Sequence, residues 1–514
     1  MPERPAGLQG GTRGSKAQLD ALQPFQYVRR IMIVLLRTIG LPVPVLLLLI
    51  GCMGGQLAPP VATPASDEKV AVTTVPLPQG VASGDVTSRT ARIWFRTSGP
   101  ARVELEWAPD GRGAELTGTR ALTTSPEQSF TATVSIDNLQ PATSYRYRVT
   151  ARRSAALSTG QIVEETGSGT FRTAPADTRS EPVMFAWSGD LGGQKRCRDL
   201  WGGYPIFDRI LQVKPDFFIM LGDTIYADDT CPSPPNVPGA DFVASTLEQY
   251  RTKHRYQRGS AALQRFLEAI PVYTIWDDHE VRNNFSGLAD PQMSAGRQAF
   301  LEYWPIGTPA DDPARLYRSF RRGADAEVFI LDTRQYRDLN AKPDGLAKTM
   351  LGTAQREWLI DSLDRSPATW KFIVTSVPLS NPKGGTVQVP GNDSWVGAMD
   401  GTGFHTELRA IIHALSKRQV RNVIWLAGDV HYTQVNAYDP NNDGTADFHE
   451  FIVGPLSAAP GLPLPPDPAF KPATLHSEGG FYNFGVITVK KTELRLEIVD
   501  DTGRTRFTYA IKAL

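Results

Sequence analysis

Four apolar runs in this sequence lead directly into residues that can bind a metal ion. Short apolar runs bounded by polar residues are typical of fully buried strands. Residues 183–188 lead to Asp190, residues 217–221 to Asp223, residues 272–276 to Asp277-Asp278-His279-Glu280, and residues 423–427 to Asp429-Val430-His431. An ordinary turn with an acidic residue would explain one such run, but not four. Because ligands of open α/β sheets lie past the carboxyl ends of the strands, the pattern predicts a metal site there.

The candidate ligands are of the four kinds that hard divalent or ferric ions accept: carboxylate, imidazole, amide and phenolate. They are Asp190, Asp223, Tyr226, Asp278, His279, Asn283, Asn284, Asp429 and His431. Asp223 and Tyr226 are three residues apart on one loop, and Asp429 and His431 are two apart, so each pair can serve one site. Two neighbouring metal ions can polarise a phosphoryl group and lower the pKa of water. The absence of a Cys-x-x-Cys pair argues against a structural zinc site.

The segments around these residues predict a layered α/β domain over residues 182–514. Residues 204–213 carry apolar side chains at helical spacing, with Ile206, Ile210 and Leu211 on one face. Similar spacing occurs at residues 241–269, 353–364 and 404–416, further strands are predicted at 327–331 and 370–374, and residues 481–511 alternate as antiparallel strands. Strands that alternate with helices are typical of a layered α/β sheet.

Residues 76–175 show a different pattern, of short alternating strands separated by turn residues. Regular short strands over about a hundred residues predict a β-sandwich. Residues 139–149, with the pattern Leu-x-Pro-x-Thr-x-Tyr-x-Tyr-x-Val, resemble fibronectin type III modules. This segment holds no cluster of His, Cys or carboxylate residues, so we assign it no chemistry.

The first 52 residues are interpreted as a leader and not as part of the fold. Basic residues at 29, 30 and 37 precede a short apolar core and then Leu49-Ile50-Gly51-Cys52. This end resembles the lipobox of bacterial lipoproteins, in which Cys52 would be lipidated; the alternative is a plain secretory signal with an incidental cysteine. Residues 53–75 are interpreted as a flexible tether. We expect an exported cell-envelope lipoprotein, periplasmic or at the surface, that contacts the membrane through its lipid anchor only.

The charge of the chain does not indicate a polyanionic partner. Lys plus Arg and Asp plus Glu number 54 each. Nucleic-acid-binding domains usually carry a basic excess on one face, so we expect none here. We expect a monomer.

The two remaining cysteines are predicted to form a disulfide. Cys197 follows Asp190 by seven residues and Cys231 follows Asp223 by eight, so both lie on loops that leave neighbouring site strands. Strands adjacent in a sheet are about 5 Å apart, within reach of disulfide geometry, and export places the pair in an oxidising compartment. The alternatives are two free thiols, or Cys197 as a thiolate metal ligand.

The site motifs resemble the PhoD-type alkaline phosphatase/phosphodiesterase family, a branch of the calcineurin-like metallophosphoesterases. The matching motifs are residues 79–85 with 93–96 in the β domain, and residues 222–226, 276–284, 331–337 and 428–431 in the α/β domain. The resemblance covers most of the exported chain. It implies an N-terminal β domain, a metallophosphoesterase domain and hydrolysis of phosphate esters.

The resemblance also implies roles for individual residues. Asp223 would bridge two metal ions, Tyr226 would bind ferric iron, and Asp429 and His431 would complete the ligand set. Asn283 would bind a second, calcium-like ion, with Asn284 or Asp278 as alternatives. The implied metals are Fe³⁺ with Ca²⁺; Mn²⁺, Zn²⁺ or two divalent ions are the alternatives.

Two further residues are expected to contact the substrate. His279 would contact the substrate or its leaving group. Arg334 would bind a phosphate oxygen, which its guanidinium geometry suits; the alternative is a structural arginine paired with Asp332. The remaining histidines are interpreted as structural or surface residues: His254, His405, His413, His449 and His476.

The first motif departs from the family pattern. The best-known branch has a Cys thiolate ligand where this chain has Asp190, and Gly192 stands where the wider superfamily has a His. A carboxylate is a harder ligand than a thiolate and tolerates metals other than iron. Residues 393–397 match the family's pocket strand only in part.

The predicted function is metal-dependent hydrolysis of phosphate monoesters or diesters outside the cytoplasm. One alternative is a phosphodiesterase specialised for lipid head groups, nucleotides or wall polymers. An alternative of another class is a surface binding protein in which the α/β domain has no catalytic activity. Fold alone does not decide among these.

Overall fold

The computed structural model describes residues 72–514 except 112–115, 155–161, 385–389 and 398–400. The predicted leader with Cys52, and most of the predicted tether, therefore lie outside the described residues. Within the described part of the chain, no helix is both long enough and apolar enough to cross a membrane.

The last residues of the predicted tether form a strand, which corrects that boundary. Strand β1 (Val72–Pro76) pairs in parallel with β8 (Ile162–Arg172). The first four residues of β1 are Val or Thr, which favour strands, and the backbone hydrogen bonds of an edge strand require no apolar content. The flexible-tether interpretation therefore does not apply to residues 72–75.

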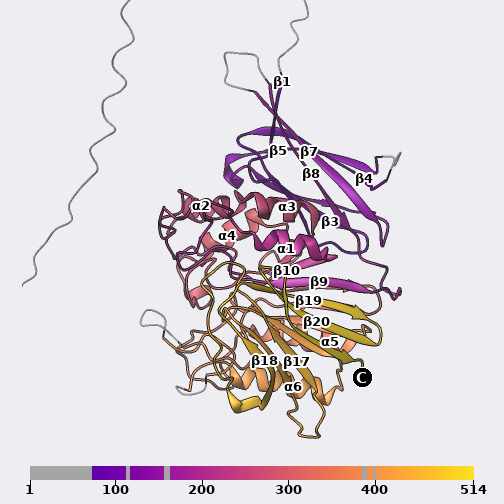
Figure 1. Ribbon diagram of the computed structural model, residues 1–514, viewed down its shortest axis with the longest axis vertical. Helices are drawn as coiled ribbons and strands as arrows, with labels where there is room; N and C mark the ends of the chain where they lie inside the picture. Colours follow the sequence, from indigo (N-terminus) through magenta and orange to yellow (C-terminus); the bar gives the residue numbers. More distant parts are fainter. Residues whose placement is uncertain (1–71, 112–115, 155–161, 385–389, 398–400) are drawn as a thin grey trace, which may run out of the picture. The chain divides into compact units, whose positions relative to one another are not determined.

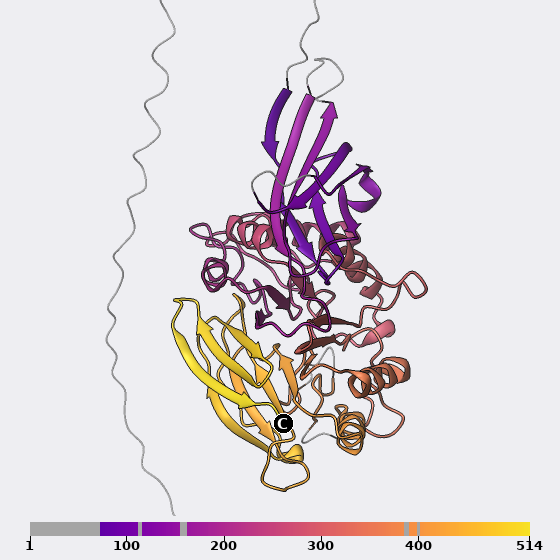
Figure 2. The same ribbon diagram turned by 90° about the vertical axis from the view of Figure 1, so that its right-hand side faces the viewer.

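The N-terminal strands form a sandwich, as predicted. Its five-stranded sheet has the order β1-β8-β7-β4-β5, with long strands visible in indigo to magenta in Figure 2. The other strands of this sheet are β4 (Ala101–Pro109), β5 (Gly118–Thr124) and β7 (Ser144–Ser154). The facing layer contains β2 (Val81–Gly84), β3 (Ala91–Arg96) and β6 (Thr131–Ile136). Ile93 and Phe95 pack against Leu105 and Val149 between the two layers.

The second layer of the sandwich continues into the sheet of the α/β domain. Gly84 of β2 pairs with Val272 of β11, so the two predicted domains share one nine-stranded sheet of order β21-β20-β19-β9-β10-β11-β2-β3-β6. Its other strands are β9 (Val183–Ser188), β10 (Phe217–Met220), β11 (Val272–Thr274), β19 (Asn483–Lys490), β20 (Glu493–Asp500) and β21 (Thr505–Lys512). Strands β9, β10 and β11 are parallel.

A third, seven-stranded sheet has the order β12-β13-β14-β15-β17-β16-β18. Its strands are β12 (Arg318–Arg322), β13 (Ala326–Ile330), β14 (Trp370–Val374), β15 (Val423–Ala427), β16 (Thr433–Tyr438), β17 (Phe448–Ile452) and β18 (Pro472–Glu478). Strands β13, β14, β15 and β17 run in parallel. The apolar residues of β13, β14 and β15 are buried on both faces of the sheet, which is why these three segments are mostly apolar.

The two α/β sheets pack face to face and carry helices on their outer sides. Phe185 of β9 meets Phe372 of β14 edge to face, with ring centroids 5.0 Å apart. The helices are α1 (Ile206–Val213), α2 (Leu247–Arg258), α3 (Ala261–Ala269), α4 (Met293–Tyr303), α5 (Gly352–Arg365) and α6 (His405–Lys417), with short 3₁₀ helices at Pro126–Gln128, Gly287–Ala289 and Pro468–Phe470. Helices α1 and α3 lie beside β9 and β10 (Figure 1), and Phe266 of α3 packs edge to face on Phe218. Helices α5 and α6 share a second core with β13, β14 and β15.

The predicted fold class is confirmed: N-terminal strands precede a layered α/β domain. The helical segment 241–269 divides into α2 and α3 at Gly259 and Ser260, and Thr246 begins α2 with a capping box to Gln249. The carboxyl ends of the parallel strands in both α/β sheets lead into the loops that carry the predicted ligands.

Candidate metal centre

Five of the predicted ligands have a left-handed backbone conformation. The φ angles are 63° at Asp190, 48° at Asp223, 58° at Asn284, 72° at Asp429 and 61° at His431. L-residues seldom adopt this conformation, although Asp and Asn tolerate it best. Such residues cluster at functional sites because the surrounding structure imposes the turn. Here the turns direct strand-end side chains toward one another.

A first ligand group contains Tyr226, His431 and Asp190. The Tyr226 hydroxyl lies 2.9 Å from Nε2 of His431, and this nitrogen lies 3.4 Å from Oδ1 of Asp190. Nδ1 of His431 donates to the carbonyl of Ala459 at 2.8 Å. A neutral imidazole bonded in this way presents the lone pair of Nε2 to a metal ion.

A second ligand group contains four buried carboxylates. Oxygens of Asp223, Asp277, Asp278 and Asp429 lie within 4.8 Å of one another, and His279 forms a similar group with Asp223 and Asp278. Asp277 already accepts hydrogen bonds from Arg334 at 2.5 Å and from Ser376 at 2.6 Å. Of the adjacent pair, Asp278 is therefore the one that could bind a metal ion, and its Oδ1 has no hydrogen-bond partner.

Several buried oxygens in these groups lack any hydrogen-bond partner. They are Oδ2 of Asp190, Oδ1 of Asp278, Oδ1 of Asn284 and Oδ2 of Asp429. A buried oxygen without a partner costs about 1–3 kcal/mol, and more when it is charged. Four such oxygens from two sheets fit bound cations, which would use these lone pairs.

The electrostatics also fit cations. Burial raises the pKa of Asp223 well above its usual range, and the carboxylates of Asp278 and Asp277 raise it further. Burial raises the pKa of Asp429 to about 7, although Lys383 opposes this change. Carboxylates this close disfavour one another's ionised forms. Bound cations would remove that repulsion.

The two predicted asparagines differ in their surroundings. Asn284 is buried, its side-chain oxygen has no partner, and its backbone N–H donates to Oδ2 of Asp278 at 2.7 Å. Asn283 lines the open cavity, and its backbone N–H donates to Asp228 at 2.8 Å. The geometry favours Asn284 as the amide ligand, which was the predicted alternative to Asn283.

His279 is held by a neighbouring carboxylate. Its Nδ1 lies 2.6 Å from Oδ1 of Asp228. Burial lowers the pKa of His279, but the carboxylates of Asp228 and Asp278 outweigh this and raise it to about 9. Because Nδ1 is engaged, Nε2 is the nitrogen that can act on a ligand or substrate.

Tyr226 occupies a slot between a glycine and a histidine. Its ring stacks on His279 with centroids 4.0 Å apart, and a Cβ on Gly193 would lie 2.3 Å from the Tyr226 ring. The slot therefore requires a residue without a side chain at position 193.

The glycine at position 192 has a similar explanation. A Cβ there would lie 2.4 Å from the Tyr204 hydroxyl and 2.5 Å from Nε2 of Gln257. These two side chains bond to each other and fill the space that a histidine would need. The packing of Tyr204 and Gln257 therefore explains why this chain has Gly192 where the wider superfamily has a histidine.

Arg334 lies beside the centre but does not face the cavity. Its guanidinium is fully buried, donates to both oxygens of Asp393 at 2.7 Å, and donates from Nε to Asp277. Of the N–H groups of Arg334, only the backbone N–H donates to Asp332, at 3.1 Å. This geometry supports neither the predicted phosphate contact nor the predicted alternative pair with Asp332. It makes Arg334 a positioning residue for Asp277 and its neighbour Asp278.

The structure adds site residues that the sequence reasoning did not select. Glu280 accepts the backbone N–H groups of Asp223, Thr224 and Asp277 at 2.6–3.0 Å, which fixes the two ligand loops together. In the sequence, only the position of Glu280 in the acidic run after β11 indicated a role at the site. Lys383 contacts Asp278 and Asp429 from a loop with no recognisable pattern.

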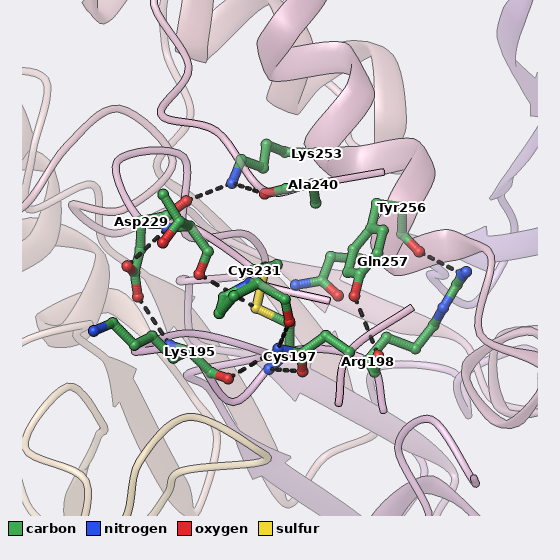
Figure 3. The surroundings of a disulfide bond; sticks show 12 residues. Lys195, Cys197, Arg198, Asp229, Cys231, Ala240, Lys253, Tyr256 and Gln257 are labelled. Carbon is green, nitrogen blue, oxygen red and sulfur yellow. Dashed lines mark hydrogen bonds between the residues drawn. A yellow bond between two sulfur atoms is a disulfide. The ribbon is translucent and has the colours of Figure 1, made fainter. Parts of the chain in front are cut away.

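The predicted disulfide between Cys197 and Cys231 is present, with Cα atoms 5.8 Å apart (Figure 3). It lies next to Lys253, whose ammonium donates to the carbonyls of Asp229 at 2.5 Å and Ala240 at 2.9 Å. Burial lowers the pKa of Lys253 to about 8. The bridge joins the loops that follow Asp190 and Asp223, and Lys253 joins α2 to the second of these loops.

The other histidines lie outside the centre. His254 and His449 are buried, His413 is exposed on α6, and His405 and His476 are partly buried. Burial lowers the pKa of His254 to about 3 and that of His449 to about 4, so both are neutral at pH 7.

A cavity of about 430 Å³ opens onto the centre. Asp223, His279, Asp429 and His431 form its floor, while Pro382, Tyr432, Leu462 and Leu464 contribute to its walls. The side chains of Leu462 and Leu464 are 76% and 58% exposed. The cavity can therefore admit a molecule with a polar group at the acidic cluster and an apolar group at the rim.

Comparisons with known proteins agree with this arrangement. Residues 185–496 match a model described as PhoD-like phosphatase, and residues 62–175 match the PhoD-like phosphatase N-terminal domain. Alkaline phosphatase D of Bacillus subtilis (strain 168) is 28% identical over 400 residues, covering 69% of this chain and 64% of the relative's length.

Two solved structures share the fold. A structure of PhoD superimposes with a TM-score of 0.70 at 23% identity and covers 87% of this chain and 92% of that chain. Purple acid phosphatase PPD1 from yellow lupin (Lupinus luteus) seeds superimposes with a TM-score of 0.59 at 16% identity and covers 84% and 73% of the two chains. The layered sheets belong to this common fold.

Proposed function

The chain belongs to the PhoD-like phosphatase family, and from this and the geometry of the centre we propose that it hydrolyses phosphate esters with bound metal ions. The single observation that carries the proposal is the set of buried, unpartnered oxygens on Asp190, Asp278, Asn284 and Asp429. These oxygens are buried at or behind the floor of the cavity, to which Asp429 contributes, and cations would supply the partners that they lack.

The two ligand groups would hold two metal ions. Tyr226, His431 and Asp190 would hold one, and Asp278, Asn284 and Asp429 would hold the other, with Asp223 between them. Bound metal ions would polarise the phosphoryl group and stabilise the negative charge that develops on it. The carboxylates and the carbonyl of Ala459 fix the ligand orientations before substrate arrives.

Iron with calcium is the proposed metal pair. A phenolate oxygen is a hard anionic donor suited to ferric iron. Within the first ligand group, the Tyr226 hydroxyl lies beside Nε2 of His431. The carboxylate and amide oxygens of the second group suit calcium. Manganese, zinc or two divalent ions are the alternatives, because Asp190 is a harder ligand than a cysteine thiolate.

His279 is the proposed proton donor to the leaving group. It lines the cavity, and Asp228 holds Nδ1, so that Nε2 can face the substrate. An imidazole that carries a proton on Nε2 can give it to the departing oxygen.

The substrate would be a monoester or diester with an apolar leaving group. The exposed leucines at the rim, Leu462 and Leu464, support this choice. We further propose that the enzyme acts outside the cytoplasm, that it is a monomer, and that a lipid on Cys52 anchors it to the membrane.

The test combines metal analysis with two substrates. The protein, purified without chelator, is expected to hold about two metal ions per chain and to hydrolyse p-nitrophenyl phosphate, bis-p-nitrophenyl phosphate or both. The ratio of the two rates gives the monoester or diester preference. A folded protein that binds metal and turns over neither substrate would contradict the proposal.

A further inference from the structure

Lys383 occupies a distinctive place in the cavity. Among the described residues that line it, Lys383 is the only lysine or arginine. Its side chain is 23% exposed, so it reaches both the acidic floor and the open space above it. A cation at this point can meet an anion that enters the cavity.

The ammonium of Lys383 lies among carboxylates. Nζ donates to Oδ1 of Asp429, lies 3.5 Å from Oδ2 of Asp278, and lies 4.0 Å from Oδ2 of Asp393. Asp278 and Asp429 are proposed metal ligands. Cations bound to these two carboxylates would neutralise their charge and weaken their attraction for the ammonium.

The backbone of Lys383 is fixed while its side chain can turn. The backbone N–H donates to Oγ of Ser394 at 3.1 Å, and the carbonyl accepts the N–H of Asp393 at 2.9 Å. Asp393 is itself held by Arg334 and Arg337. The ammonium, on its flexible four-carbon stem, can therefore move without a change in the loop.

The other nearby guanidinium groups cannot take this role. Arg334 and Arg337 are buried, and both are bound to Asp393. Neither lines the cavity. A phosphate ester at the floor would therefore find its cationic side-chain partner in Lys383 rather than in an arginine.

We propose that Lys383 binds the phosphate group of the substrate, and that it leaves Asp278 and Asp429 to do so when the centre is loaded. The assignment rests on the proposed phosphoesterase function. The ammonium would donate hydrogen bonds to a non-bridging phosphate oxygen, which makes Lys383 a substrate-binding residue.

The test measures binding of inorganic phosphate to the metal-loaded protein by titration calorimetry. Lys383→Gln removes the charge, Lys383→Arg keeps it, and Lys491→Gln removes a charge from an exposed turn between β19 and β20. Lys383→Gln is expected to weaken phosphate binding by about 10- to 100-fold, the range for a hydrogen bond to a charged group. Lys383→Arg should recover part of the affinity, and Lys491→Gln should match wild type.

Metal content and thermal unfolding of the loaded variants separate the possible outcomes. The proposal requires metal content in Lys383→Gln to stay at the wild-type level while phosphate affinity falls and KM for p-nitrophenyl phosphate rises. Unchanged phosphate affinity in an active Lys383→Gln variant would overturn the assignment alone. A wild-type protein that binds neither metal nor phosphate would overturn the proposed function and the assignment with it.

Discussion

The carboxylate of Asp393 accepts hydrogen bonds from both terminal nitrogens of the Arg334 guanidinium, each 2.7 Å long. Both side chains are fully buried, and the third guanidinium nitrogen, Nε, donates to Asp277. Arg334 thus joins the loop after β13 to the loop that carries Lys383 and to the run that carries Asp278. The two carboxylates orient the arginine, and the arginine in turn fixes their positions beside the ligands.

Substitution of Arg334 should therefore destabilise the fold. Removing one partner of a buried ion pair leaves the other charge without compensation and costs about 3–5 kcal/mol. We expect Arg334→Ala to lower the free energy of unfolding by this amount in urea titrations. Arg418 is the control, because its pairs with Asp361 and Asp364 are exposed, and Arg418→Ala should cost less than about 1 kcal/mol. Wild-type stability with weakened phosphate binding would instead restore the phosphate-contact role for Arg334.

Acid should destabilise the protein through His254. The ring is buried against Tyr303, with centroids 5.2 Å apart, and burial lowers its pKa to about 3. In the unfolded chain the pKa is about 6.5. Since the folded pKa is the lower one, the unfolded chain binds more protons between these values, and stability falls as pH decreases below about 6.5.

The comparison is between His254→Phe, which keeps the stacking without titrating, and the exposed control His413→Phe. The difference in the pKa of His254 between the folded and the unfolded chain lowers the free energy of unfolding at pH 5 by about 2 kcal/mol relative to neutral pH. The free energy of unfolding of His254→Phe should therefore fall less than that of wild type between pH 7.5 and pH 5, while His413→Phe should follow wild type. Parallel curves for all three proteins would show that His254 does not contribute.

The sequence predicted the strands, and it placed most of the candidate ligands at strand ends, because both features are encoded locally. A buried parallel strand is a nearly continuous apolar run, and Asp190, Asp223 and Asp429 follow such runs directly. The identity of the amide ligand could not be predicted in this way. Asn283 and Asn284 are adjacent, and they are distinguished only in the structure, where the left-handed turn at Asn284 accompanies a buried side chain.

Contacts between distant segments account for what the sequence did not predict. The partners of Arg334 lie 57 and 59 residues away, whereas the nearby Asp332 was the natural choice from spacing. Lys383 lies in a loop without periodicity or a motif. Helix α4 carries buried residues that are interrupted by polar ones, so its apolar face is weakly marked.

Loss of the disulfide should lower stability without removing the ligands. The bridge joins residues 34 apart and restricts the unfolded chain, which is worth about 3–4 kcal/mol for a loop of this length. In a Cys52→Ser background, we expect Cys197→Ser with Cys231→Ser to lower the free energy of unfolding by this amount. A reductant should shift the urea midpoint of the parent and not that of the double variant. Two free thiols in the denatured, unreduced parent would contradict the bridge.

Substitution of Tyr226 should remove colour and iron. A phenolate bound to ferric iron gives a visible charge-transfer band, and burial raises the pKa of Tyr226 well above its usual range, so only a strong cation would deprotonate it. The protein purified without chelator should be coloured and contain iron, and Tyr226→Phe should lose the band. A colourless, iron-free and fully active wild type would exclude ferric iron and leave the phosphoesterase assignment in place.

Gly193 gives a way to move Tyr226 without changing it. A Cβ at position 193 would lie 2.3 Å from the Tyr226 ring, a distance that real contacts do not reach. Because the ring is also stacked on His279 at 4.0 Å, Gly193→Ala should displace the Tyr226 hydroxyl from His431. We expect kcat/KM for p-nitrophenyl phosphate to fall about 10-fold or more, as misplacement by 1 Å can cost 10²-fold, and the charge-transfer band to weaken or shift.

The matched control is Gly202→Ala on the same loop. A Cβ at position 202 would meet no atom within 4 Å, and an added methyl group there restricts only the unfolded chain. Gly202→Ala should therefore keep the wild-type spectrum and kcat/KM, with unchanged or slightly higher thermal stability. If Gly193→Ala also keeps the wild-type spectrum and activity, the ring of Tyr226 is not confined by the slot, and its position there does not determine metal binding.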